Sequence, residues 1–318
     1  MKDRENKMSE LQIEIKDGIL TKFDKNFAAA YIIPDTVKEI GPHAFEDCKM
    51  TEIFMPDTVE SIQEAAFKGC KNLKAINISQ NVAVIPFNCF EDTPSLKICR
   101  LTNNTSLIQQ EAFKNSGLEF FAIPANALAI GMGAFSDCKY LREIEFPPHP
   151  QFQSIQPLFA AGCTSLNKIA IPSEITEIGM EAFKGCTNLK SVIIDSSGDL
   201  GVDFIGAFAF ANCKSLKEMI IPDTIEDIRE YAFANTDIDE LVINYPYLCS
   251  EYAFENTKPE FKLTFKNCPA KYIDTINETF GKYLVKSIDE LLEESDNKKM
   301  SLSDINKRII EGKINEER

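Results

Sequence analysis

Histidine is scarce in this chain: only His43 and His149 occur among 318 residues, and neither has the spacing of a metal-ligand motif. The sequence also contains no glycine-rich phosphate loop, no nucleophile elbow and no carboxylate pair that stands out from its many other acidic residues. Nearly all other residues capable of chemistry fall into the repeated structural positions described below. We therefore expect no enzymatic activity, no catalytic residue, no cofactor and no metal site.

Basic residues are also in deficit, with 34 Lys and Arg against 49 Asp and Glu and a formal charge of -15. Nucleic acid is not an expected partner, because phosphate binding relies on clustered Lys and Arg. No run of 18 apolar residues occurs, so no membrane insertion is expected. The first ten residues lack the apolar stretch of a secretory signal. The location is therefore left open: cytoplasmic for the sequence as given, or cell surface or secreted if a leader precedes it.

The sequence does contain one pattern of 22–27 residues, which is repeated about ten times between residues 33 and 265. Its clearest copy begins at Ile171-Pro172, continues through Phe183 and Cys186, and ends at Ile194. A unit this short cannot bury its own apolar face, so the copies must stack into a solenoid. The Leu-x-x-Ile-x-Ile segment of each copy predicts a short parallel strand, which a following Pro ends in six copies. The segment between this Pro and the Phe, such as 58–62, is a candidate for a second strand.

One position of the repeat is aromatic and predicts a stack of rings along the solenoid. It is occupied by Phe45, Phe67, Phe90, Phe113, Phe135, Phe183, Phe210, Phe233 and Phe254. One copy reverses the usual Ala-Phe order and reads Phe159-Ala160, which predicts a local shift of the ring by one residue.

The position two residues after the Phe accepts only Gly, Asn or Asp, the residues that tolerate a left-handed backbone. Each copy is therefore expected to end a short helical turn there. Calcium binding is the alternative, but Gly fills the position in three copies, Gly69, Gly162 and Gly185, and supplies no side-chain oxygen.

The next position holds Cys in six copies and Thr or Ser in others, which predicts a small inward side chain rather than a disulfide or a metal ligand. Cys89, Cys99 and Cys249 fall in other core positions, and Cys268 alone remains unassigned.

These residues resemble the repeat of the BspA-like, or Treponema pallidum type, leucine-rich repeat family over about three quarters of the chain. The resemblance implies an α/β repeat fold, a right-handed solenoid of short parallel strands and short helical turns without enzymatic activity. Proteins of this kind are commonly found on the surface of bacteria or protists and are often assigned to adhesion or protein binding. The segment 15–22 is similar to the strand pair that often precedes such repeats.

Three regions follow from this reading: residues 1–32 form an N-terminal tail and capping hairpin, 33–265 the solenoid, and 266–318 a helical cap or docking segment. The Asp17-Gly18 pair predicts the hairpin turn, with Ile13, Ile15 and Ile19 covering the open end of the core. Apolar spacing predicts an amphipathic helix over about 271–294 and a second short helix from about 301 to 310. These helices either cap the last repeat or dimerise the chain, and the second role would make a homo-oligomer.

We expect the leading function to be binding of a protein partner of unknown identity on a concave sheet surface. The outward strand positions form two columns, and one of them is apolar from Ala170 to Val242. Strand propensity alone could also place Ile and Val there. The candidate binding residues from both columns are Phe120, Ala170, Ile193, Glu218, Ile220, Glu240 and Val242. Insertions at 147–151 and 195–199 are either specificity loops or tolerated drift. The alternative function is an intracellular scaffold that assembles laterally or end to end.

Overall fold

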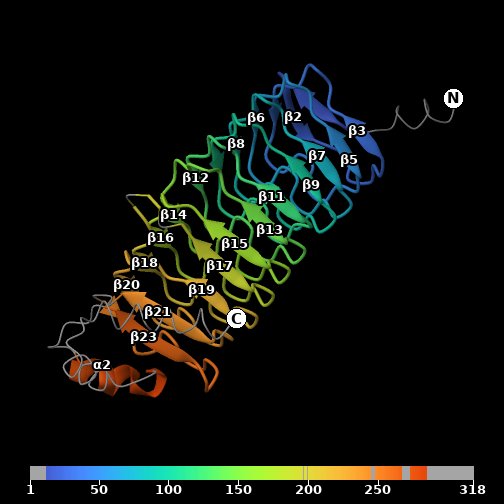
Figure 1. Ribbon diagram of the computed structural model, residues 1–318. Coiled ribbons are helices and arrows are strands. Elements are labelled where there is room, and N and C mark those ends of the chain that lie inside the picture. The colour runs from blue at the N-terminus through green and yellow to red at the C-terminus, as the bar shows by residue number, and fades with distance from the viewer. Residues whose placement is uncertain (1–11, 196, 199, 245–247, 267–272, 285–318) are drawn as a thin grey trace, which may run out of the picture.

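The computed structural model describes residues 12–195, 197–198, 200–244, 248–266 and 273–284. These residues form an elongated solenoid in which each turn contributes one strand to each of two rows (Figure 1). The predicted stacking of repeats is confirmed, and the buried residues form one continuous apolar core between the rows.

The first row consists of parallel strands of three to five residues, which we call the long row. Its strands are β3 (Ala30–Ile32), β5 (Glu52–Phe54), β7 (Ala75–Asn77), β9 (Ile98–Arg100), β11 (Phe120–Ala122), β13 (Glu143–Glu145), β15 (Lys168–Ile171), β17 (Ser191–Ile194), β19 (Glu218–Ile220), β21 (Glu240–Asn244) and β23 (Lys262–Lys266). Ladder hydrogen bonds join them in the groups β3-β5-β7-β9, β11-β13, β15-β17-β19 and β21-β23. These are the strands that the Leu-x-x-Ile-x-Ile segments predict.

The second row, the short row, lies on the opposite side of the core. It contains β2 (Ile19–Lys22), β4 (Glu39–Ile40), β6 (Ser61–Ile62), β8 (Val84–Ile85), β10 (Leu107–Ile108), β12 (Ala129–Ile130), β14 (Ser154–Ile155), β16 (Glu177–Ile178), β18 (Phe204–Ile205), β20 (Asp227–Ile228) and β22 (Leu248–Cys249). The second strand predicted within residues 58–62 is therefore present as β6. All but β2 contain only two residues, because tight turns begin directly after them.

Between the short and long rows the described chain forms consecutive turns rather than regular helix. The Gly/Asn/Asp position has positive φ in every copy, for example 58° at Asp47 and 52° at Asn256, as its composition predicts. A second left-handed position, two residues before the Phe position, is not marked by composition. It is occupied by His43, Ala65, Asn88, Glu111, Gly133, Leu158, Glu181, Phe208 and Tyr231. Stacking imposes this conformation even on residues such as Leu158 and Phe208, which rarely adopt it alone.

The predicted aromatic stack is present and fully buried. From Phe45 to Phe135, adjacent rings lie 5.1–5.7 Å apart between centroids and within 5–10° of parallel. The rings from Phe183 to Phe254 repeat this geometry at 5.5–5.7 Å. Offset stacking of rings adds to the free energy gained by burying them.

The stack is interrupted at Phe159, where the predicted shift by one residue is observed. The Phe135 backbone N–H donates to the Phe159 carbonyl, a contact that Ala makes in neighbouring turns, so Ala160 holds the usual Phe position. The Phe159 ring is consequently tilted by 75° against Phe135 and by 69° against Phe183. Phe146 fills the adjoining space with its ring centroid 6.0 Å away.

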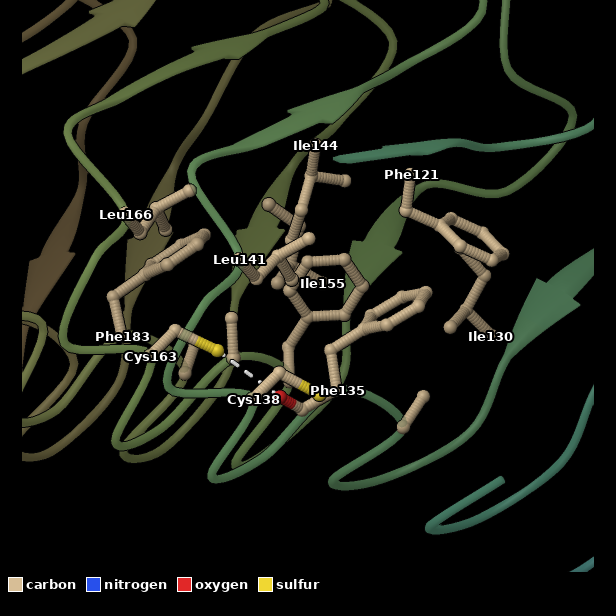
Figure 2. Packing of buried hydrophobic residues seen from close by; sticks show 14 of the residues in the cluster. Phe121, Ile130, Phe135, Cys138, Leu141, Ile144, Ile155, Cys163, Leu166 and Phe183 are labelled. Carbon is tan, nitrogen blue, oxygen red and sulfur yellow. Dashed lines mark hydrogen bonds between the residues drawn. The ribbon is translucent and has the colours of Figure 1, made fainter. Parts of the chain in front are cut away.

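The cysteine position is an inward corner of the turn. Six thiols donate to the carbonyl of the Phe position in the preceding turn, as Cys163 does to Phe135 at 3.0 Å (Figure 2). Where Thr replaces Cys, as at Thr93, the hydroxyl donates to the Phe carbonyl of its own turn at 2.7 Å. Any small donor therefore satisfies this corner, which is why Cys, Thr and Ser exchange there. The nine described cysteines form no disulfide, and Cys268 lies outside the described residues.

The N-terminal end is closed by the predicted hairpin and by aromatic rings. Strand β1 (Glu14–Lys16) pairs antiparallel with β2 around Asp17 and Gly18, both at positive φ. The expected covering residues are only partly correct: Ile13 and Ile19 are half-buried, whereas Ile15 is 39% exposed. The alternation of β2 turns Leu20 inward instead, and the end of the ring stack is closed by the residues Phe23, Phe27 and Tyr31.

The C-terminal end is closed by a shorter helix than the sequence predicts. Helix α2 (Ile273–Phe280) continues as the 3-10 turn η2 (Gly281–Tyr283), and Leu284 is already extended and bridges to Leu263. One helix through residue 294 is therefore wrong, because the Tyr283 side chain packs into the core and its hydroxyl donates to the Phe254 carbonyl at 3.0 Å. The expected second helix lies outside the described residues.

Candidate partner-binding face

The outward side of the long row carries the candidate residues, because alternate strand positions face opposite sides. In β15, β17 and β19 the residues Ile169, Val192 and Met219 are buried. Their neighbours Ala170, Ile193 and Ile220 stand in register on the outer surface. The three apolar side chains therefore form a row across adjacent strands, which we call the apolar row.

Exposure is not uniform along this column. Ile193 and Ile220 are 46% and 75% exposed, unusually high for large aliphatic side chains aligned on neighbouring strands. Val242 in β21 is half-buried, and Thr264 in β23 is buried. Moreover, β19 and β21 belong to different hydrogen-bonded groups. Between Ala170 and Val242, the exposed part of the column therefore consists of the three residues of the apolar row.

The remaining candidates lie in the second column. Phe120 in β11 is 48% exposed and pairs with Glu143 of β13, so two repeats separate it from Ile193. Glu218 stands in β19 beside Ser191, and Glu240 in β21 is half-buried. The structure thus separates Phe120 from the apolar row, whereas Glu218 lies in β19, the same strand as Ile220 of the apolar row.

A second apolar area, near the N-terminus, was not singled out from the sequence. Ile32, Phe54 and Ile98 are 72%, 49% and 44% exposed, and Phe54 and Ile98 line a hollow of about 150 Å³ on the long row. Asn77 and Arg100 interrupt the apolar column there with a side-chain contact of 3.5 Å. Only the pairing register, which places Ile32 beside Phe54, reveals this area.

A larger hollow adjoins the apolar row. It measures about 310 Å³, and Ala170 and Ile193 form part of its lining. Pro147 and Pro148 of the first insertion line it from one repeat, and Asp195 of the second insertion lines it from another. Two loops that are nearly 50 residues apart in the sequence therefore border the same hollow, together with Glu143 and Glu145 from β13. We call this the insertion hollow.

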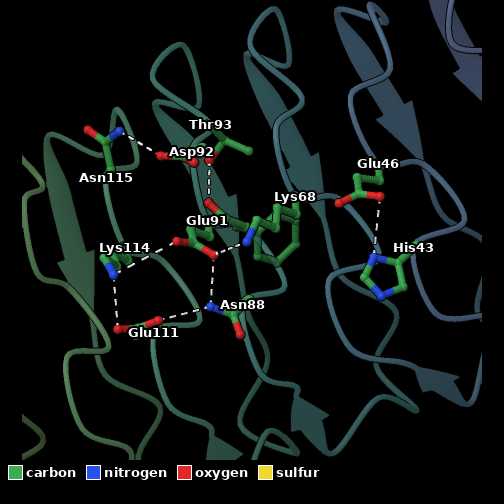
Figure 3. Close-up of polar contacts among 11 residues, drawn as sticks. His43, Glu46, Lys68, Asn88, Glu91, Asp92, Thr93, Glu111, Lys114 and Asn115 are labelled. Carbon is green, nitrogen blue, oxygen red and sulfur yellow. Dashed lines mark hydrogen bonds and ion pairs between the residues drawn. The ribbon is translucent and has the colours of Figure 1, made fainter.

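Polar residues elsewhere are engaged in structural pairs. Figure 3 shows the Glu91 carboxylate between the Lys68 ammonium and the Asn88 amide. The two distances are 2.7 and 2.8 Å, and Glu91 is only 9% exposed. Lys114 binds Glu111 at 3.0 Å in the same group. The hydrogen bond from the Lys68 ammonium to Glu91 raises the pKa of Lys68. Because each charge here has an opposite partner, this cluster stabilises adjacent turns rather than presenting a site.

The two histidines occupy separate surface positions. His43 lies 3.3 Å from Glu46, and His149 lies 2.8 Å from Glu174.

Burial raises the pKa of the Cys48 and Cys186 thiols to about 12, which keeps both protonated and poorly nucleophilic at neutral pH. In the part of the chain that the structure describes, no group of three His, Cys, Asp or Glu side chains is placed to hold a metal ion. Nor does any helix there reach the length and apolar character needed to cross a bilayer.

Stacked parallel strands with a buried aliphatic and aromatic column in each turn define the class of leucine-rich-repeat solenoids. The family described as BspA type Leucine rich repeat region (6 copies) matches residues 21–142, 106–200, 129–262 and 195–289. The chain belongs to this family.

Two solved structures of bacterial leucine-rich-repeat proteins share the fold, and a third is similar to part of the chain. A protein from Bacteroides ovatus is 26% identical, with a TM-score of 0.72, over 80% of this chain and 70% of its own. One from Eubacterium ventriosum is 22% identical, with a TM-score of 0.52, over 70% of this chain and 68% of its own. The Treponema pallidum leucine-rich-repeat protein is 24% identical, with a TM-score of 0.47, over 66% of this chain and 89% of its own. No functionally curated protein matches the chain.

Proposed function

We propose that this chain is a non-enzymatic protein-binding module that contacts its partner through the outward face of the long row. The observation that carries the proposal is the alignment of Ala170, Ile193 and Ile220 as exposed apolar side chains on three paired strands. Removing such side chains from water is the main driving force of protein association. Adhesion to a protein on another surface is one form of this function.

Strand propensity does not account well for the apolar row. Other outward positions of the long row hold Asn77, Arg100, Glu145 or Lys168, so the strands form equally well with polar side chains. Aromatic and helical residues cover the described ends of the ring stack, which supports lateral binding over an end-to-end scaffold.

The test is capture of proteins by crosslinking on the wild type and on an Ile193→Glu, Ile220→Glu double variant. We expect recovery of the specific partner to fall at least about tenfold, because each side chain is a candidate hot spot of 1 kcal/mol or more. The matched control is Leu128→Glu, Met180→Glu: these side chains are 56% and 50% exposed but lie outside the long row. Unchanged capture by a correctly folded double variant would refute the proposal.

A further inference from the structure

We propose that the insertion hollow binds a Lys or Arg side chain of an extended partner segment, with an aliphatic neighbour of that residue lying on the apolar row. This inference rests on the proposed function and specifies the partner's chemistry. It follows from the combination of apolar walls, unpaired charge and position on the long row.

The walls suit the long carbon chain of a basic side chain. The lining includes Ala170 and Ile193 from the strands, together with the apolar residues Pro147, Pro148 and Pro172. Lys and Arg commonly lay their methylene groups along apolar surface while the charged end reaches a polar environment. Ile220 continues the same surface on the next strand and is available to an aliphatic neighbour.

The charge of the lining selects a cation. Glu143 and Glu145 are both exposed on the outward side of β13, and Asp195 of the second insertion also lines the hollow. Among the described residues of the lining, Lys168 is the one basic residue. Within the described part of the chain neither Glu143 nor Glu145 forms an ion pair, whereas Glu91 and Glu111 do. A partner's ammonium or guanidinium group would therefore meet an excess of negative charge that the fold has not already neutralised.

Asp195 is held in a defined position at this edge. Its carboxylate accepts the Ser197 backbone N–H at 2.9 Å, and this hydrogen bond holds the pKa of Asp195 below its usual value. The Asp195 backbone N–H donates to the Ile171 carbonyl at 2.8 Å, which ties the loop to the neighbouring strand. The negative charge is thus present at neutral pH and fixed at the border of the hollow.

The experiment uses a phage-displayed library of random linear peptides selected on the full chain. The test variant is Glu143→Gln, Glu145→Gln, Asp195→Asn, which removes three charges while keeping similar shapes and the Asp195 acceptor. The control variant Asp35→Asn, Glu60→Gln, Glu64→Gln changes the net charge equally at exposed positions outside the long row. Affinities of the selected peptides are then measured for all three proteins at low and high salt.

We expect the wild type to select peptides rich in Lys or Arg next to Leu, Ile or Val. Their dissociation constants should rise about tenfold or more in the test variant, stay within about twofold in the control, and rise with salt. Selection of neutral or acidic peptides, or equal affinity for test and control variants, would overturn the inference. So would a concentration-dependent dimer of the wild type that the test variant abolishes, since it would assign the hollow to a second copy of this chain.

Failure of this inference is distinguishable from failure of the proposed function. If the Ile193→Glu, Ile220→Glu variant loses peptide or partner binding while the charge variant retains it, the face binds a partner of different chemistry. If neither variant changes binding, both the basic-segment inference and the use of this face are wrong.

Discussion

At the scale of single residues, the role of a side chain depends on its position in the turn more than on its chemical type. Phe90 lies in the buried ring stack, whereas Phe54 faces solvent from a strand of the long row. Cysteines that could suggest redox or metal chemistry fill inward corners and donate weak hydrogen bonds. Residue type alone therefore misleads here, and comparison of the copies corrects it.

Replacement of Phe90 by Ala should lower the free energy of unfolding by about 3–5 kcal/mol, the usual cost of truncating a buried Phe. Phe90 is fully buried and stacks on Phe67 and Phe113 at 5.2 and 5.3 Å. Urea unfolding followed by circular dichroism measures the change. Phe54→Ala is the control and should cost less than about 1 kcal/mol, since this side chain is 49% exposed. Equal losses of unfolding free energy in the two variants would contradict the expectation that the buried ring stack stabilises the fold more than an exposed ring does.

The buried thiols should make the fold less stable in alkali. The pKa of Cys186 is raised from 9.0 to about 12, so above pH 9 the thiol ionises in the unfolded chain while it stays protonated in the folded one. The unfolded state then binds fewer protons, and stability falls by up to about 1.4 kcal/mol per pH unit for this thiol between pH 9 and 12.

Cys186→Thr tests this expectation, because Thr occupies the same corner in other turns, as at Thr93. The free energy of unfolding should fall less steeply with pH in the variant than in the wild type above pH 9, and equally below pH 8. Parallel pH profiles for the two proteins would show that the thiol does not ionise differently on unfolding.

At the scale of elements, the strands and turns form only when they contact neighbouring copies of the repeat. Strand β6 contains two residues, and the left-handed conformation at Leu158 and Phe208 is unfavourable in isolation. Hydrogen bonds to the adjacent turns, such as the one from the Leu158 N–H to the Met180 carbonyl, hold these segments in place. For this reason the residue composition of the second left-handed column did not allow its conformation to be predicted from the sequence.

The C-terminal element illustrates the same limit. Apolar spacing predicted a helix through residue 294, but the described helix ends at Phe280 and its 3-10 extension at Tyr283. The Tyr283 ring packs 5.5 Å from Phe261, and that tertiary contact overrides the helical pattern. Spacing alone could not reveal which apolar side chain turns toward the last repeat.

Phe280→Ala should separate a capping role of α2 from a dimerising one. The Phe280 ring lies 5.4 Å from Phe265 and 6.4 Å from Phe254, so its loss should destabilise the last turns by about 3 kcal/mol. Hydrogen exchange should accelerate in residues 248–266, while the molecular mass from light scattering stays constant. A change in mass without faster exchange would instead assign α2 to an interface between copies.

At the scale of the whole molecule, stability should be nearly a sum of terms for turns and their neighbours, as in other solenoids. Phe67 contacts Phe90, but several turns separate it from Phe233. The losses in Phe67→Ala, Phe233→Ala should therefore add within about 0.5 kcal/mol, whereas those in Phe67→Ala, Phe90→Ala should deviate from additivity by more. Urea unfolding of the single and double variants measures both. Equal deviations would mean that turns far apart in the solenoid are energetically coupled, which would contradict a sum of nearest-neighbour terms.

The long row also shows what becomes visible only in the assembled molecule. The Ala170, Ile193 and Ile220 column and both insertions could be recognised in the sequence, but only as separate features. In the structure Pro147, Pro148 and Asp195 border one hollow with this column, because consecutive turns stack in register. Sequence spacing does not specify which sides of two loops face each other.

The sequence by itself determined the solenoid, the ring stack, the left-handed Gly/Asn/Asp corners and the inward cysteines. Each is a local demand repeated in every copy, so comparison of copies separates it from chance. The tertiary structure alone decided where the helical pattern ends, which strands leave their apolar residues exposed, and that two distant insertions meet. These features depend on contacts between unlike segments, which occur once in the chain and carry no periodic signal.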